Sequence, residues 1–266
     1  MFIQNVAAKV IVINHSRPSK KLSNFFVISL KLYHIYDKVK SVMIKSENIF
    51  DDIEPLVAIW VEDSDTVELA RIANMVIDDG VEYVSLPCAV THVFWPWIEN
   101  SNVKILNRFD FVIQQNSDMD MVVSEFATAV NSGFRAGAFG AQVRVSWPDI
   151  QKFVGAILPI KNDLFFGRYL SIAIDIDDAA TPDWDVVFAN LARISPNSVL
   201  IMGHVDKFNP RSDFVGRIYG MLEQWNINSD IHLMFGKNML RVSQALRLVQ
   251  KMRPELVKNM RVFLKK

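Results

Sequence analysis

The sequence predicts an α/β protein in which eight parallel strands alternate with helices and close into a barrel. Short β-branched runs alternate with amphipathic helical segments from Leu56 onward, at a repeat of roughly 20 to 35 residues that is typical of strand-helix units. No glycine-rich phosphate-binding fingerprint follows a predicted strand, so a closed barrel is favoured over an open doubly wound sheet. The length of 266 residues, half of them hydrophobic, suits one such domain.

The predicted strands are short and rich in branched apolar residues. They cover 56–62, 82–87, 103–110, 137–145, 170–177, 199–206, 231–236 and 261–264. Strands that are joined by helices are expected to pair in parallel. Nothing after Leu264 is long enough for an eighth helix, so either the N-terminal segment fills that place or the barrel has a gap there.

Helix signals lie between these strands. Thr181 precedes Pro182, which predicts a hydroxyl N-cap followed by a proline in the first helical turn. Asp65 and Glu68 resemble a capping box at the start of another helix. Apolar residues spaced by three and four after Ser212 predict a third helix with one buried face.

Residues 1–42 differ from the rest of the chain because they show no sustained helical or strand period. We interpret them as an N-terminal extension, with the barrel domain covering 43–266. Met43 is then a candidate true start. The alternative is a real arm or capping strand around 9–14, where a β-branched apolar run occurs.

Composition narrows the functional classes. Twenty-nine basic residues balance twenty-nine acidic ones, which argues against a nucleic-acid partner and an anionic membrane surface. The longest early apolar run, 25–30, is too short to span a bilayer and lacks the pattern of a signal peptide. The single cysteine, Cys88, excludes an internal disulfide and fits a reducing compartment, so we expect a cytoplasmic protein.

The alternation of strands and helices over 56–264 resembles the aldolase-type TIM barrel superfamily. This resemblance implies a (β/α)8 fold. It rests on architecture, and no catalytic motif of the superfamily is matched. It therefore assigns no site residues.

Polar residues gather at the predicted carboxyl ends of the strands, where barrels of this kind carry their active sites. Alternate strand residues face the barrel interior. With the isoleucines of the fifth strand packed against helices, Asp175 and Asp177 face inward. The same reasoning turns His204 and Asp206 inward on the sixth strand and Glu62 inward on the first.

Candidate substrate-binding residues come from neighbouring strands. Either Asn107 or Arg108 faces the interior on the third strand, while Gln142 and Arg144 share one face of the fourth. An arginine in this position can bind an anionic substrate. Asp206, the last residue of the sixth strand, and Lys237, just after the seventh, complete the predicted substrate-binding set, although the signal for a phosphate is weak.

Carboxylates that lie close together raise each other's pKa, and histidine titrates near neutrality, so this set can supply an acid and a base. Asp175, Asp177, Glu62 and His204 are therefore the predicted catalytic groups. The same oxygen and imidazole donors suit Mg²⁺, Mn²⁺ or Zn²⁺, but no ligand spacing selects one of them. Binding of a divalent metal is therefore left as an alternative, and no cofactor is assigned.

Two functions are compatible with these residues. The first is a small-molecule enzyme, a lyase or isomerase acting on a carbonyl-containing or sugar-like substrate. The second is a non-catalytic barrel that binds a ligand or a protein, because this architecture serves many functions. Convergence of Glu62, Asp175 and His204 would favour the enzyme. Strand-end polar groups can equally cap helices, and His204 can be a core histidine.

Other reactive or apolar residues have ordinary structural interpretations. Cys88 is expected to be a structural thiol, and Lys207 and Lys237 fit poorly as Schiff-base lysines because neither is expected to face inward. Barrel filling is expected of Trp60, Met202 and Met234. The apolar cluster at 94–98 is expected to be a buried helix face, with a homo-oligomer contact as the alternative.

Overall fold

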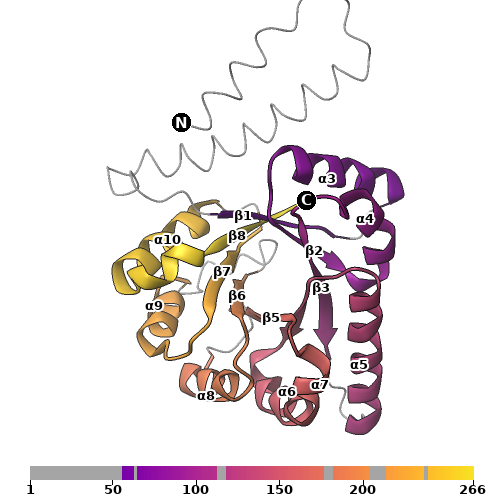
Figure 1. Ribbon diagram of the computed structural model, residues 1–266. Helices are drawn as coiled ribbons and strands as arrows, with labels where there is room; N and C mark the ends of the chain where they lie inside the picture. Colours follow the sequence, from indigo (N-terminus) through magenta and orange to yellow (C-terminus); the bar gives the residue numbers. More distant parts are fainter. Residues whose placement is uncertain (1–55, 63–64, 113–117, 177–181, 204–213, 237–238) are drawn as a thin grey trace, which may run out of the picture. The chain divides into compact units, whose positions relative to one another are not determined.

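The computed structural model describes residues 56–62, 65–112, 118–176, 182–203, 214–236 and 239–266 (Figure 1). Eight parallel strands close into a barrel in the order β1-β2-β3-β4-β5-β6-β7-β8, which confirms the predicted fold class. The strands are β1 Leu56–Trp60, β2 Tyr83–Pro87, β3 Lys104–Phe111, β4 Gly140–Val145, β5 Tyr169–Asp175, β6 Ser198–Met202, β7 Asp230–Met234 and β8 Arg261–Lys265. The predicted boundary at residues 42 and 43 lies outside the described residues.

Helices surround the barrel (Figure 1). They are α3 Thr66–Asp78, α4 Thr91–Ile98, α5 Met119–Arg135, α6 Ile150–Ile157, α7 Lys161–Phe165, α8 Trp184–Ile194, α9 Phe214–Gln224 and α10 Met239–Met252. Short 3-10 turns occur at η1 Cys88–Val90, η2 Trp147–Asp149, η3 Leu158–Ile160 and η4 Pro254–Asn259. In the described part of the chain no helix follows β8, and none is long and apolar enough to cross a membrane.

The helix starts follow local capping chemistry. Asp65 caps α3 as predicted, with its carboxylate accepting the Glu68 N–H at 2.8 Å. The predicted start at Thr181 is wrong, because α8 begins at Trp184 and Asp183 caps it by accepting from the Val186 N–H. A carboxylate both accepts this hydrogen bond and interacts favourably with the positive end of the helix dipole. The third start, at Ser212, lies outside the described residues.

Each predicted strand shifts at one end or both, and the sixth, predicted to reach residue 206, ends at Met202. The fourth strand was expected from residue 137, but β4 starts at Gly140 because Gly137 has a φ of 99° in the turn after α5. That conformation is not extended and favours glycine. The first strand ends at Trp60, although Val61 N–H still donates to the Ser85 carbonyl at 2.9 Å and Glu62 N–H donates to the Lys266 carbonyl at 3.4 Å.

Apolar side chains from most of the strands fill the barrel interior. The buried cluster comprises Ala58, Trp60, Tyr83, Leu106, Ala173, Leu200, Met202, Met234 and Phe263. This confirms the predicted inward faces of β1, β5 and β6. It also confirms that Trp60, Met202 and Met234 fill the barrel. The polar ends of the same strands are thereby directed at the barrel mouth.

The third strand resolves an alternative that the sequence left open. Asn107 lies on the outer face, where it accepts a hydrogen bond from the Thr91 hydroxyl of α4 and lies against Gly133 of α5. Arg108 faces inward, with its guanidinium carbon 4.1 Å from the centre of the Trp60 ring. Arg108 is thus the polar residue that β3 contributes to the barrel interior.

Candidate functional site

Asp175 is the last residue of β5, and its side chain is only 4% exposed. Its Oδ2 lies 3.6 Å from Nη2 of Arg144 on the neighbouring strand β4. The chain just beyond it is held in place, because Ile176 N–H donates to the Met202 carbonyl at 2.9 Å and Arg217 of α9 donates to the Ile176 carbonyl. Asp175 is therefore a fixed, nearly desolvated carboxylate beside a cation.

Arg144 links two carboxylates at the mouth. Besides Asp175, its Nη1 lies 3.9 Å from the exposed Oδ1 of Asp110 on β3. The Arg144 side chain is 37% exposed, so the cation is accessible to solvent while Asp175 is not. A ligand that entered the mouth from solvent would meet the arginine first.

Glu62 belongs to a different ion pair from Asp175. Its Oε1 lies 2.7 Å from Nζ of Lys265, the last residue of β8. In the closed strand order β1 and β5 lie on opposite sides of the barrel. Glu62 and Asp175 thus face the same mouth from opposite walls, each beside a cation of a neighbouring strand.

Gln142 lies deeper in the barrel than Arg144 on the same face of β4. It is fully buried, and its Oε1 accepts a hydrogen bond of 2.7 Å from the Ser85 hydroxyl of β2. Its Nε2 has no hydrogen-bond partner among the described residues. Arg108 is its register neighbour on β3.

Four predicted site residues, Asp177, His204, Asp206 and Lys237, lie outside the described residues. Of the described candidates, Asp175 and Arg144 contact each other, and Arg108 and Gln142 are neighbours on adjacent strands. Glu62 lies across the mouth from Asp175. No group of three or more His, Cys, Asp or Glu side chains is placed to hold a metal ion within the described ranges.

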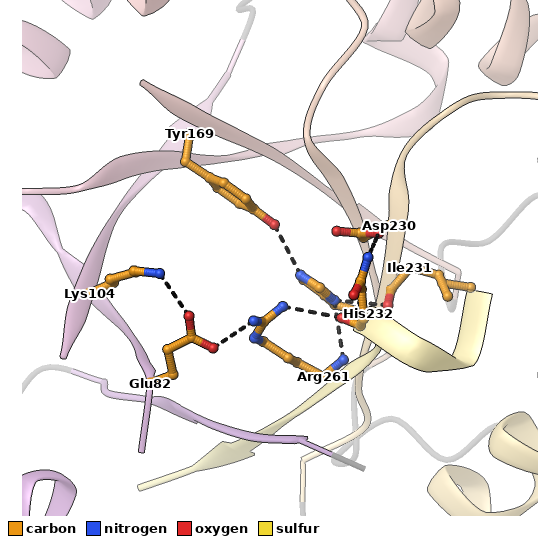
Figure 2. Close-up of polar contacts among 8 residues, drawn as sticks. Glu82, Lys104, Tyr169, Asp230, Ile231, His232 and Arg261 are labelled. Carbon is orange, nitrogen blue, oxygen red and sulfur yellow. Dashed lines mark hydrogen bonds and ion pairs between the residues drawn. The ribbon is translucent and has the colours of Figure 1, made fainter. Parts of the chain in front are cut away.

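A second polar network occupies the opposite, amino-terminal end of the barrel (Figure 2). Glu82 bridges two cations, with 2.7 Å to Nζ of Lys104 and 2.7 Å to Nη2 of Arg261. Burial alone would raise the pKa of Glu82, but the hydrogen bonds from Lys104 and Arg261 hold it below its ordinary value. The Arg261 guanidinium also lies over the Tyr83 ring at 4.2 Å.

His232 lies inside this network and is almost completely buried. Its Nε2 is 3.2 Å from the Tyr169 hydroxyl, and its Nδ1 is 2.8 Å from the Ile231 carbonyl oxygen (Figure 2). Burial, helped by the positive charge of Arg261, lowers the pKa of His232 to about 3. Burial likewise raises the pKa of Tyr169 to about 12. Both groups are therefore neutral near pH 7 and do not exchange protons there. We interpret this end of the barrel as structural, as is usual for the amino-terminal end of the fold.

Sequence reasoning missed Lys265 and this network. Lys265 follows the inward Phe263 by two residues, so extending the eighth strand by one residue would have found it. His232 lies between Ile231 and Leu233, which face outward, so the alternation along the strand would have predicted that His232 faces inward. Glu82 and Arg261 are 179 residues apart, and no local sequence signal reports such a pair.

Cys88 lies outside the barrel, beside an open groove of about 490 Å³ whose other lining residues all belong to α5. Its Sγ donates to the Ala129 carbonyl at 3.5 Å, and burial raises the pKa of the thiol. A raised pKa keeps the thiol protonated and a poor nucleophile. This agrees with a structural cysteine.

The apolar cluster on α4 is only partly buried. Phe94 and Ile98 are in the core, as predicted, whereas Trp97 is 37% exposed. The prediction of one continuous buried face is therefore wrong for Trp97, because the eight-residue helix turns that side chain away from the barrel.

Comparison with solved structures identifies the architecture. A candidate deoxyribose-phosphate aldolase from Toxoplasma gondii ME49 superimposes with a TM-score of 0.61 at 10% identity, covering 88% of this chain and 93% of that one. The aldolase QR15 gives 0.58 at 9% identity, with 81% and 92% covered. The chain shares the (β/α)8 barrel fold of these proteins. At this identity the likeness concerns the fold alone. No protein-family model matches the sequence, and a search of curated proteins also gives no match.

Proposed function

We propose that this protein is a small-molecule enzyme, a lyase or isomerase that acts on a carbonyl-containing or sugar-like substrate, with Asp175 as its proton acceptor. The observation that carries the proposal is the contact between the buried Asp175 carboxylate and the solvent-accessible Arg144 at the carboxyl ends of β5 and β4. This is the end of the barrel at which enzymes of this fold carry their chemistry.

The chemistry is proton abstraction beside a carbonyl. Asp175 accepts a proton from the carbon next to the carbonyl group, and the electrons of that C–H bond move to the carbonyl oxygen. Arg144 stabilises the negative charge on that oxygen, because a preorganised cation in a partly desolvated site opposes charge development most effectively. In a 2-hydroxy carbonyl substrate, transfer of the hydroxyl proton to the oxyanion and return of the carbon-bound proton to the former carbonyl carbon exchange the positions of the carbonyl and hydroxyl groups, which is an isomerisation. Addition of the enolate to a second carbonyl group, or the reverse cleavage, is a lyase reaction.

The solved structures with this fold are consistent with that reaction class. They include aldolases and, at a TM-score of 0.52 and 10% identity, a D-psicose 3-epimerase crystallised in the presence of D-fructose. A deoxyribose phosphate aldolase from Aeropyrum pernix, with a TM-score of 0.52, is tetrameric. A homo-oligomer and a cytoplasmic location remain predictions for this chain, as do the roles of Asp177, His204, Asp206 and Lys237.

The rival function is a barrel that binds a ligand without transforming it. The separate ion pairs of Glu62 and Asp175 favour this alternative, since each carboxylate already has a structural role. Ligand binding alone does not separate the two functions, because both proteins would bind a ligand. Proton transfer that depends on Asp175 is expected only of the enzyme.

Thermal shift measurements on wild type, Asp175→Asn and Asp78→Asn test whether Asp175 belongs to the site, because Asp78 is exposed at the end of α3, away from the strand ends that carry Asp175. The panel contains sugars, sugar phosphates, 2-oxo acids, Mg²⁺, Mn²⁺ and Zn²⁺. A ligand at saturating concentration is expected to raise the melting temperature of wild type and of the exposed control Asp78→Asn by about 5 °C or more. The shift should be clearly smaller for Asp175→Asn. Equal shifts in all three proteins would remove Asp175 from the site.

A further inference from the structure

Arg108 and Trp60 form a stacked pair inside the barrel, below the Asp175 level. The guanidinium carbon is 4.1 Å from the indole centre, so the planar cation lies over the ring face. Trp60 is buried, while Arg108 keeps part of its surface accessible. This contact restricts the guanidinium, whose N–H donors lie in the plane of the group.

Gln142 supplies a second donor beside this pair. Its Oε1 is engaged by the Ser85 hydroxyl at 2.7 Å, which orients the amide. The buried Nε2 has no hydrogen-bond partner among the described residues, and Gln142 is the register neighbour of Arg108. A buried donor without an acceptor is unfavourable, so an acceptor delivered by a ligand would remove that penalty.

The same face of β4 connects this position to the proposed proton acceptor. Gln142 and Arg144 are two residues apart on one strand and therefore lie on the same, inward side. Arg144 contacts Asp175 on β5, and Gln142 neighbours Arg108 on β3. A small ligand held by Arg108 and Gln142 thus places its next atoms in the direction of Arg144 and Asp175.

We propose that the substrate carries a carboxylate, bound by the Arg108 guanidinium and the Gln142 amide against the Trp60 ring. That the substrate also carries a reacting carbonyl group rests on the proposed function. A carboxylate next to a carbonyl group makes the substrate a small 2-oxo acid. A planar carboxylate matches a guanidinium fork and an amide N–H.

Isothermal titration calorimetry with pyruvate, its neutral amide pyruvamide, and inorganic phosphate tests the proposal. Wild type is expected to bind pyruvate at least tenfold more tightly than pyruvamide or phosphate. Arg108→Lys keeps the charge but loses the fork, and should weaken pyruvate binding at least tenfold. Arg168→Lys is the matched control, because Arg168 also stacks on an aromatic ring, Phe134 at 5.0 Å, near the amino-terminal end of β5. Its pyruvate affinity should be unchanged.

Three results would overturn the carboxylate site: no saturable pyruvate binding, equal affinity for pyruvate and pyruvamide, or an Arg108→Lys variant that is folded by circular dichroism and binds like wild type. Gln142→Glu gives a second reading, since it keeps the shape but replaces the Nε2 donor by a carboxylate. It should also weaken pyruvate binding, and unchanged affinity would contradict the proposal. Asp175→Asn should bind pyruvate more weakly than wild type but still prefer pyruvate to pyruvamide, because Arg108 and Gln142 are intact. Loss of the proton acceptor and failure of the carboxylate site therefore give different results.

Discussion

Arg144 lies 3.6 Å from Asp175, and the two members of this pair differ sharply in their access to solvent. The arginine side chain is 37% exposed and the aspartate side chain 4%. Burial of a carboxylate costs hydration, and the positive charge of Arg144 offsets part of that cost. The same arrangement keeps a proton acceptor out of bulk water and places a positive charge where an oxyanion would form.

The lowered pKa of the buried His232 predicts that the folded protein becomes less stable in weak acid. Its pKa is lowered from 6.5 to about 3 in the folded protein, so below pH 6.5 the unfolded chain binds a proton that the folded chain refuses. The free energy of unfolding should therefore fall as the pH falls, by about 2 kcal/mol between pH 7 and pH 5 from this group. Urea unfolding at the two pH values measures it. His232→Asn should lack this loss, whereas a variant of the exposed His92 should keep it. Parallel pH curves for wild type and His232→Asn would contradict the assignment.

The close approach of Gly133 to the outer face of β3 predicts that a larger residue at this position destabilises the protein. A Cβ at this position would lie 1.7 Å from Nδ2 of Asn107, which is buried and bonded to Thr91. Gly133→Ala should thus lower the free energy of unfolding by about 1 to 3 kcal/mol. Gly155→Ala is the control, because a Cβ there meets nothing within 4 Å and alanine is the better helix former. It should be stabilising by roughly 0.5 to 1 kcal/mol. Equal effects of the two substitutions in chemical denaturation would show that the contact with Asn107 is not tight.

The sequence was sufficient to predict the barrel and the inward face of β5. Its alternating isoleucines define one face of the strand, which leaves Ala173 and Asp175 on the other. The third strand was ambiguous because apolar residues occur on both of its faces. The choice between Asn107 and Arg108 depends on partners from distant segments, Thr91 and Gly133 for one and Trp60 for the other.

Pairing between side chains was beyond the reach of the sequence. Strand parity placed Glu62 and Asp175 at one mouth, but it did not reveal that each has a cation beside it from an adjacent strand. The amino-terminal network was missed for a similar reason. Its members start several different strands, and they meet only once the barrel has closed.

The central claim is that Asp175 removes a proton from a carbon beside a carbonyl group, and hydrogen exchange measures that step without knowledge of the second substrate. Proton NMR follows the loss of the pyruvate methyl signal in D₂O in the presence of enzyme. Wild type and the exposed control Asp78→Asn are expected to accelerate the exchange over the uncatalysed rate, whereas Asp175→Asn should reduce the enzyme-catalysed rate by about 100-fold or more. Exchange that proceeds equally fast with Asp175→Asn, or a wild-type protein that binds pyruvate without accelerating exchange, would contradict the account.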